Sequence, residues 1–133
     1  MDRQVLSTNI MQVARVRRRR AQRRPEAEEF VLQLVCLSRE VSRDSLLQAS
    51  RGDVEVARAR HLAMYLMHVV LQIPLTNIGK IFGRDRTTVG HACARMEDMR
   101  DDKRFDAAVM LLETEIEDWR QGHGDRGQEK RCA

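Results

Sequence analysis

The strongest structural signal in this chain is residues 74–96, PLTNIGKIFGRDRTTVGHACARM. Apolar residues recur at helical spacing on both sides of Gly83, which predicts the two helices of a helix-turn-helix. Gly83 can take the left-handed conformation that ends a helix, and Asp85 is a natural N-cap for the next one. Pro74 suits the first turn of the earlier helix, where its missing N–H is not needed. The apolar positions are Leu75, Ile78, Ile81, Phe82, Val89, Ala92, Cys93, Met96 and Met99.

The first turn of the second predicted helix carries side chains suited to reading nucleobases. Arg86, Thr87 and Thr88 lie away from the apolar stripe, and all three can hydrogen-bond base edges or phosphates. Arg86 can bind guanine through two hydrogen bonds, and the threonines can offer a hydroxyl or contact a thymine methyl. Asp85 could accept from a cytosine amino group while it caps the helix. We therefore predict base contacts from Asp85, Arg86, Thr87 and Thr88.

Residues 78–97, IGKIFGRDRTTVGHACARME, resemble the signature of the C-terminal DNA-binding domain of DnaA, the bacterial replication initiator. That signature is typically I-G-x-x-F-G-G-R-D-H-T-T-V-x-H-A. Residues 56–66, VARARHLAMYL, resemble the basic helix that precedes it, and the outline resemblance runs from about residue 26 to about residue 116. The resemblance implies an all-α, Trp-repressor-like helical bundle that binds DnaA-box-like duplex DNA. The matching residues are Ile78, Gly79, Phe82, Gly83, Arg84, Asp85, Thr87, Thr88, Val89, His91 and Ala92.

Three positions depart from that family signature. The base-reading histidine of the family is Arg86 here, and one glycine of the usual pair is missing, so that Gly83 precedes Arg84 directly. Arg86 predicts a preferred site that differs from a standard DnaA box at the base this residue meets. Gly90 lies inside the second predicted helix and should cost about 1 kcal/mol relative to alanine. Gly90 either removes a side chain that would have packed in the protein or lets the helix approach DNA more closely.

A second group of residues is suited to the sugar-phosphate backbone. Arg51, Arg58 and Arg60 surround the start of a helix predicted over about residues 53–71. Helix dipoles oppose cations at that end, so phosphate or minor-groove contact explains them better than helix stability does. His91 fits either packing or a phosphate contact. The predicted backbone contacts are Arg51, Arg58, Arg60, Lys80, Arg84 and His91.

Positive charge is concentrated at the N-terminus, although the net charge is only +4. Residues 1–24 carry eight Lys/Arg against one acid, and like charges packed so closely should keep the segment disordered when free. It is either a solvated tail or an arm that follows phosphates without sequence preference and with steep salt dependence. The arm residues are Arg15, Arg17, Arg18, Arg19, Arg20, Arg23 and Arg24.

The remaining pattern predicts three domain-level segments: the arm over residues 1–24, a helix-turn-helix domain over 25–120, and a disordered tail over 121–133. Pro25 begins a helix, and Ser42 caps a short one anchored by Leu46 and Leu47. A last helix over about residues 103–120 has an acidic outer face, so we expect it to pack behind the DNA-reading helix.

Several chemistries are disfavoured by the sequence. Three widely spaced cysteines are expected to be free thiols in a reducing cytoplasm, and no Cys/His spacing indicates zinc. Two histidines, His61 and His68, lack a third ligand. There is no phosphate-binding loop, no room for an ATPase domain and no catalytic constellation, so we expect neither an enzyme nor a cofactor. The most apolar stretch is too short to span a bilayer, and no signal core follows the basic cluster.

The predicted function is sequence-specific binding of double-stranded DNA, in control of replication initiation or in transcription regulation, at the nucleoid in the cytoplasm. The chain would compete with a replication initiator or assist it. Two alternatives stay open. One is RNA binding through the arginine arm, which the few aromatic residues count against. The other is a protein-interaction module in which the helix-turn-helix docks a partner.

Overall fold

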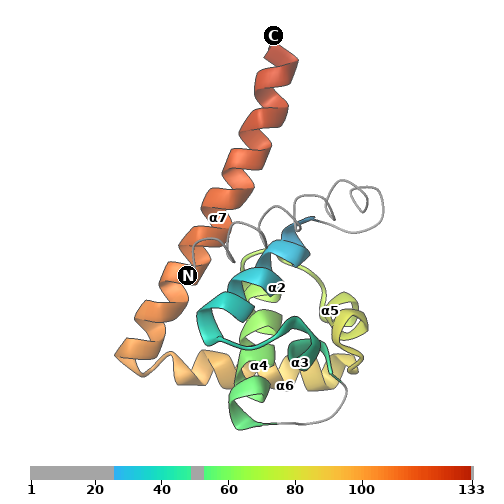
Figure 1. Ribbon diagram of the computed structural model, residues 1–133, viewed down its shortest axis with the longest axis vertical. Coiled ribbons are helices and arrows are strands. Elements are labelled where there is room, and N and C mark those ends of the chain that lie inside the picture. The colour runs from blue at the N-terminus through green and yellow to red at the C-terminus, as the bar shows by residue number, and fades with distance from the viewer. Residues whose placement is uncertain (1–25, 49–52, 133) are drawn as a thin grey trace.

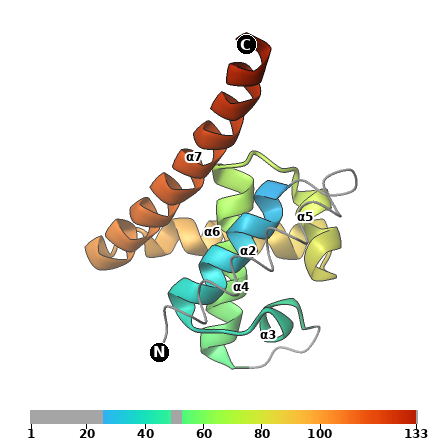
Figure 2. The same ribbon diagram turned by 45° about the horizontal axis from the view of Figure 1, so that its top comes forward.

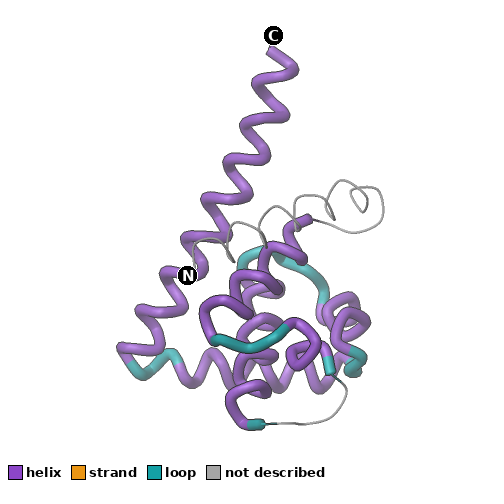
Figure 3. The backbone as a smooth tube through the Cα atoms, viewed as in Figure 1, coloured by secondary structure: helices purple, strands orange, loops and turns teal. Residues whose placement is uncertain are grey.

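The computed structural model describes residues 26–48 and 53–132, with side chains up to residue 122, and these segments form six helices and no strand (Figures 1 and 3). The predicted all-α class is confirmed. The helices are α2 (Glu26–Arg39), α3 (Arg43–Leu47), α4 (Val54–Val69), α5 (Leu75–Phe82), α6 (Arg86–Met99) and α7 (Lys103–Cys132). No helix in the described segments combines the length and the apolar character needed to cross a bilayer.

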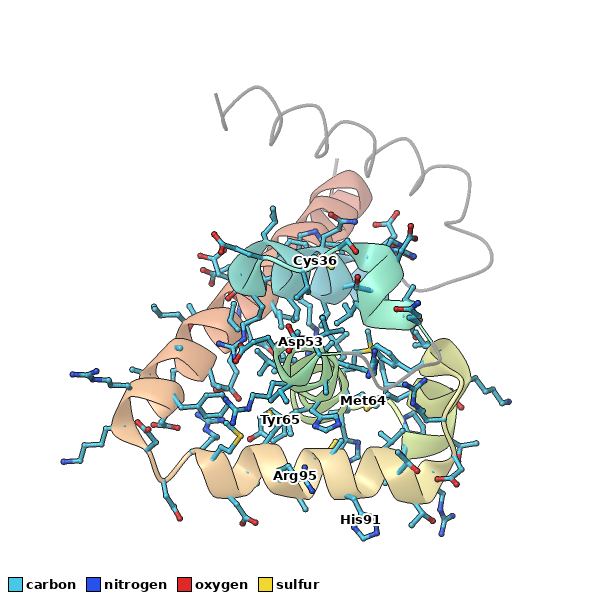
Figure 4. The ribbon with its side chains drawn as sticks, turned by 60° about the horizontal axis from the view of Figure 1, so that its bottom comes forward. Cys36, Asp53, Met64, Tyr65, His91 and Arg95 are labelled. Carbon is cyan, nitrogen blue, oxygen red and sulfur yellow. The ribbon has the colours of Figure 1, made fainter. Side chains whose placement is uncertain are left out.

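Helix α4 is the centre of the bundle. Six consecutive residues, 62–67, are buried, and a helix that is apolar around its whole circumference belongs inside a protein. Figure 4 looks nearly along α4 and shows α2 on one side of it and α6 on the other. Because α6 packs directly against this central helix, its inner face is fixed to the core and its outer face is free.

The α2–α3 layer is stabilised by a cap and an ion pair. Ser42 is the N-cap of α3, as predicted, and its hydroxyl accepts from the Ser45 amide N–H at 3.1 Å. The Arg43 guanidinium donates to both carboxylate oxygens of Glu29 on α2, one of them at 2.7 Å. The hydrogen bond to Glu29 is the main reason that the pKa of Arg43 is raised. Through these contacts, α3 is held against α2 near one end of α4.

Helix α7 runs to Cys132, beyond the helix predicted over about residues 103–120. The division into an arm, a domain and a disordered tail over residues 121–133 stays a prediction. Extending an existing helix needs no new nucleus, so the helix continues past glycines that each cost about 1 kcal/mol. Val109, Leu112 and Ile116 are buried, and Trp119 stacks on Phe30 of α2 with ring centroids 5.0 Å apart. The C-terminal end of α7 projects beyond the other helices (Figures 1 and 2).

A polar network fixes the corner between α6 and α7. The Arg100 guanidinium donates to Asp106 at 2.5 Å, to both carboxylate oxygens of Glu113, and to the Tyr65 hydroxyl at 3.1 Å. Tyr65 in turn donates to Glu97 at 2.5 Å. The hydrogen bonds that Arg100 donates to Glu113 and Tyr65 raise its pKa. The network joins α4, α6 and α7, so the direction in which α7 leaves the bundle is set by side chains as well as by packing.

Candidate nucleic-acid interface

The turn between α5 and α6 depends on two glycines. Gly83 has φ 66°, which confirms the predicted left-handed helix end. Its N–H and that of Arg84, the latter at 2.9 Å, both donate to the Gly79 carbonyl. A Cβ on Gly79 would lie 2.4 Å from the Arg84 carbonyl oxygen, so only glycine fits there. The sequence did not indicate this requirement, because the close contact between Gly79 and the Arg84 carbonyl forms only when the turn folds.

The N-terminal turn of α6 is capped and exposed. The Thr88 amide N–H donates to Asp85 Oδ1 at 2.7 Å, which confirms the predicted N-cap. Hydrogen bonds from Thr88 are the main reason that the pKa of Asp85 is lowered. Asp85, Arg86, Thr87 and Thr88 are all exposed, whereas Val89 is fully buried and anchors the turn. The site therefore has the accessibility that base contact requires.

Two further side chains lie on the outer surface of α6. His91 and Arg95 are both exposed, and they follow Thr88 by three and seven residues, which places the three on one helix face. Figure 4 shows His91 pointing away from α4. Arg95 was not among the predicted contacts. Its seven-residue spacing from Thr88, two helical turns, was the sequence signal that could have identified it.

The charge of α6 changes sign along its length. Arg86, His91 and Arg95 are exposed along its first ten residues, whereas Glu97 and Asp98 are exposed near its end. The two acids are followed by exposed Asp101 and Asp102 in the connection to α7. Phosphates are repelled by the acidic end and attracted to the other, so the N-terminal end of α6 is the one suited to a polyanion.

Arg60 does not lie where the sequence analysis expected it. Its side chain is only 4% exposed, and the guanidinium donates to the Leu46 carbonyl at 2.9 Å and the Ser45 carbonyl at 3.1 Å. Burial, and then the nearby charge of Arg84, lower its pKa. Arg60 donates to the Leu46 carbonyl at the end of α3, and it is a second donor to the Ser45 carbonyl, which also accepts from the Gln48 N–H. We therefore exclude it from the phosphate-binding set.

The other predicted backbone contacts differ in availability. Arg58 and Lys80 are exposed, and Arg58 is paired only loosely, at 3.9 Å, with Glu55. Arg84 is half-buried and donates to the Phe82 carbonyl at 2.7 Å and to the Gln48 carbonyl at 3.3 Å. Arg51 and the basic arm over residues 1–24 lie outside the described residues, so their contacts stay predictions.

The pKa of His61 is affected by the arginines around it. It lies half-buried on α4, and its pKa is lowered by burial first and then by the charges of Arg95, Arg60 and Arg84. Burial and three neighbouring positive charges therefore both disfavour the charged form of this histidine.

Gly90 faces the protein. A Cβ built there would meet only Leu75 Cδ1, at 3.7 Å, which is ordinary van der Waals contact. The missing side chain would therefore have packed against α5. Of the two interpretations drawn from the sequence, the loss of a packing side chain fits this geometry better than closer approach to DNA.

The geometry defines a class: a helix-turn-helix protein with an exposed, cation-flanked second helix. Residues 29–96, more than half of the chain, match the family described as the bacterial dnaA protein helix-turn-helix. The chain belongs to this family, and the resemblance inferred from the sequence is confirmed.

Individual relatives agree with the family assignment. The chain is 38% identical over 73 residues to the chromosomal replication initiator protein DnaA of Picosynechococcus, an alignment that covers 54% of this chain and 16% of that protein. The chain is 34% identical over 99 residues to DnaA of Thermomicrobium roseum, an alignment that covers 73% of this chain and 21% of that protein. For DnaA of Chromobacterium violaceum, it is 49% identical over 55 residues, covering 41% and 12%. The chain thus corresponds to a small fraction of each relative's length.

Proposed function

We propose that this protein binds double-stranded DNA at DnaA-box-like sequences, with the N-terminal turn of α6 in the major groove. The observation that carries the proposal is the exposed, capped turn from Asp85 to Thr88, anchored by the buried Val89. A recognition helix entering the groove by its N-terminal end presents these side chains to base edges.

The base contacts divide by chemistry. Arg86 reads guanine through O6 and N7, and the threonines contact thymine methyl groups or offer a hydroxyl. Asp85 is an acceptor for the Thr88 amide, and an exposed carboxylate can also accept from a cytosine amino group. Each good base contact contributes about 1–3 kcal/mol of discrimination.

Phosphate contacts position this turn on the duplex. Arg58, Lys80, His91 and Arg95 are exposed and suited to that role, and Arg84 contributes from the turn while it holds backbone carbonyls. The acidic end of α6 favours an orientation in which the helix leaves the groove toward α7. Arg51 and the arm over residues 1–24 would add affinity without sequence preference.

The biological role we propose is control of replication initiation, through competition with or assistance of an initiator at its boxes. Transcription regulation from the same sites is the second form of this role. Both act at the nucleoid, need no cofactor and involve no catalysis by this chain. The family assignment and the geometry of α6 support the proposal.

Fluorescence anisotropy with a DnaA-box duplex, a scrambled duplex and a single-stranded RNA tests it. The box or a variant of it should bind more tightly than the scrambled duplex, and Arg86→Ala and Thr88→Ala should reduce that ratio about tenfold or more. Ser38→Ala is the matched control, because Ser38 carries an exposed hydroxyl on α2, outside the helix-turn-helix. Equal affinity for all three nucleic acids in every variant would exclude base reading and favour the arm. No binding at all would favour a protein-interaction module.

A further inference from the structure

Helix α7 presents an apolar outer surface that no described element covers. Val109, Leu112 and Ile116 face the bundle, whereas Leu111 is 70% exposed and Met110 is 54% exposed. The other large exposed hydrophobic residues among the described side chains (Leu37, Val54 and Val69) are isolated from one another in sequence. Scattered apolar residues are ordinary on a protein surface, but an adjacent pair on the free face of a long helix is not.

The exposed residues on this face follow a heptad spacing. Arg104, Ala107, Leu111, Thr114 and Asp118 recur at intervals of three and four, and all five are exposed. Such spacing forms the seam by which one helix packs along another. We name this surface, together with Lys103, Met110 and Glu115, the α7 outer face.

The order of the charges on the α7 outer face favours an antiparallel copy of the same helix as its partner. Lys103 and Arg104 lie before Leu111, and Glu115 and Asp118 lie after it; none of the four forms a salt bridge within the described part of the chain. Two antiparallel copies of the helix would place the cations of each beside the acids of the other, and Leu111 near the partner's Ala107. A parallel pair would place like charges together.

We propose that the α7 outer face is a two-fold interface with a second copy of this chain, with the two α7 helices antiparallel. A two-fold interface must be self-complementary, and the order cation–apolar–acid along one helix meets that condition. The family match ends at residue 96, before α7 begins, so the interface is built on a segment outside the shared helix-turn-helix. Figures 1 and 2 place α7 and α5 at opposite ends of α6, so pairing leaves the DNA-reading turn free.

Sedimentation equilibrium of the full chain without DNA tests the interface independently of the proposed function. The wild type should associate to a dimer, and Leu111→Glu should weaken association about tenfold or more because it places a carboxylate in the centre of the seam. Leu37→Glu is the matched control, since Leu37 is an exposed leucine on α2, and it should associate as the wild type does. Circular dichroism verifies that both variants keep their helix content.

Charge exchange provides a second test. Reversing Lys103 and Arg104 to glutamate should weaken the dimer, and adding Glu115→Lys and Asp118→Lys to the same chain should restore it. A wild type that stays monomeric throughout a dilution series overturns the proposal. So does a dimer that persists in Leu111→Glu, or one whose stability ignores the charge reversal.

Discussion

The Thr88 amide N–H lies 2.7 Å from Oδ1 of Asp85, and this contact fixes the first turn of the helix that we propose reads DNA. An N-terminal amide that is satisfied by its own cap is not available to a phosphate. The cap leaves the side chains of Arg86, Thr87 and Thr88 exposed, and these are the groups that we propose contact DNA.

Replacing Asp85 separates its two roles. Asp85→Ala should lower Tm by about 4 °C or more through loss of the cap, whereas Asp85→Asn keeps a capping oxygen and should stay close to the wild type at neutral pH. Because the folded-state pKa of Asp85 is lowered from 3.8, its charged form adds stability above that value, and this is lost as pH falls through the lower pKa. Thermal melts from neutral to strongly acidic pH should show the wild-type advantage over Asp85→Ala shrinking in that acidic range. A constant difference would contradict the cap as the source of the shift.

Arg60 and Arg58 should behave in opposite ways. Arg60→Ala removes the side-chain donor of the buried Leu46 carbonyl and one of two donors to the Ser45 carbonyl, and should cost about 2–3 kcal/mol in urea unfolding. Arg58→Ala should change stability by less than about 0.5 kcal/mol, because its side chain is exposed. Arg58→Ala should instead weaken binding to all duplexes and reduce the salt slope by about 1. If the folded Arg60→Ala protein loses affinity in that way while Arg58→Ala does not, the two roles are reversed.

Alanine at the glycines within α5 and α6 should have opposite effects. Gly90→Ala has room for its Cβ and should stabilise the protein by about 1 kcal/mol without changing DNA affinity. Gly79→Ala forces the Arg84 carbonyl to move and should destabilise the fold. Chemical denaturation measures both. Weaker DNA binding by a stable Gly90→Ala protein would support the alternative, that Gly90 allows closer approach to DNA.

Arg86→His restores the residue typical of the family and should move the base preference toward that of a standard DnaA box. The expected change is about 1–3 kcal/mol at the one base pair that residue 86 meets, with little change elsewhere. Competition binding with duplexes substituted at each position measures it. A preference that changes at several separated positions would indicate a shift of the whole helix in the groove.

Local patterns in the sequence predicted local structure well. Gly83 and Asp85 act through backbone conformation and a contact three residues away, so residue type and spacing sufficed. Arg60 could not be assigned in this way, because its partners are carbonyls 14 and 15 residues distant that only the packing of α3 on α4 brings near. The Gly79 requirement has the same origin. The helix predicted to end near residue 120 continues in α7 to Cys132, because glycine weakens a helix without necessarily ending it.

The tight crossing at Gly79 has a consequence for how such a protein can change its target. The Arg84 carbonyl fills the space that a Cβ on residue 79 would need, so the angle between α5 and α6 is fixed by close backbone packing. The distance between a cation on α5, such as Lys80, and the N-terminal turn of α6 is therefore constant, and so is the spacing of the DNA groups that the two can contact. A new base preference must therefore come from substitutions in the first turn of α6, as at residue 86, because the angle between the two helices cannot change.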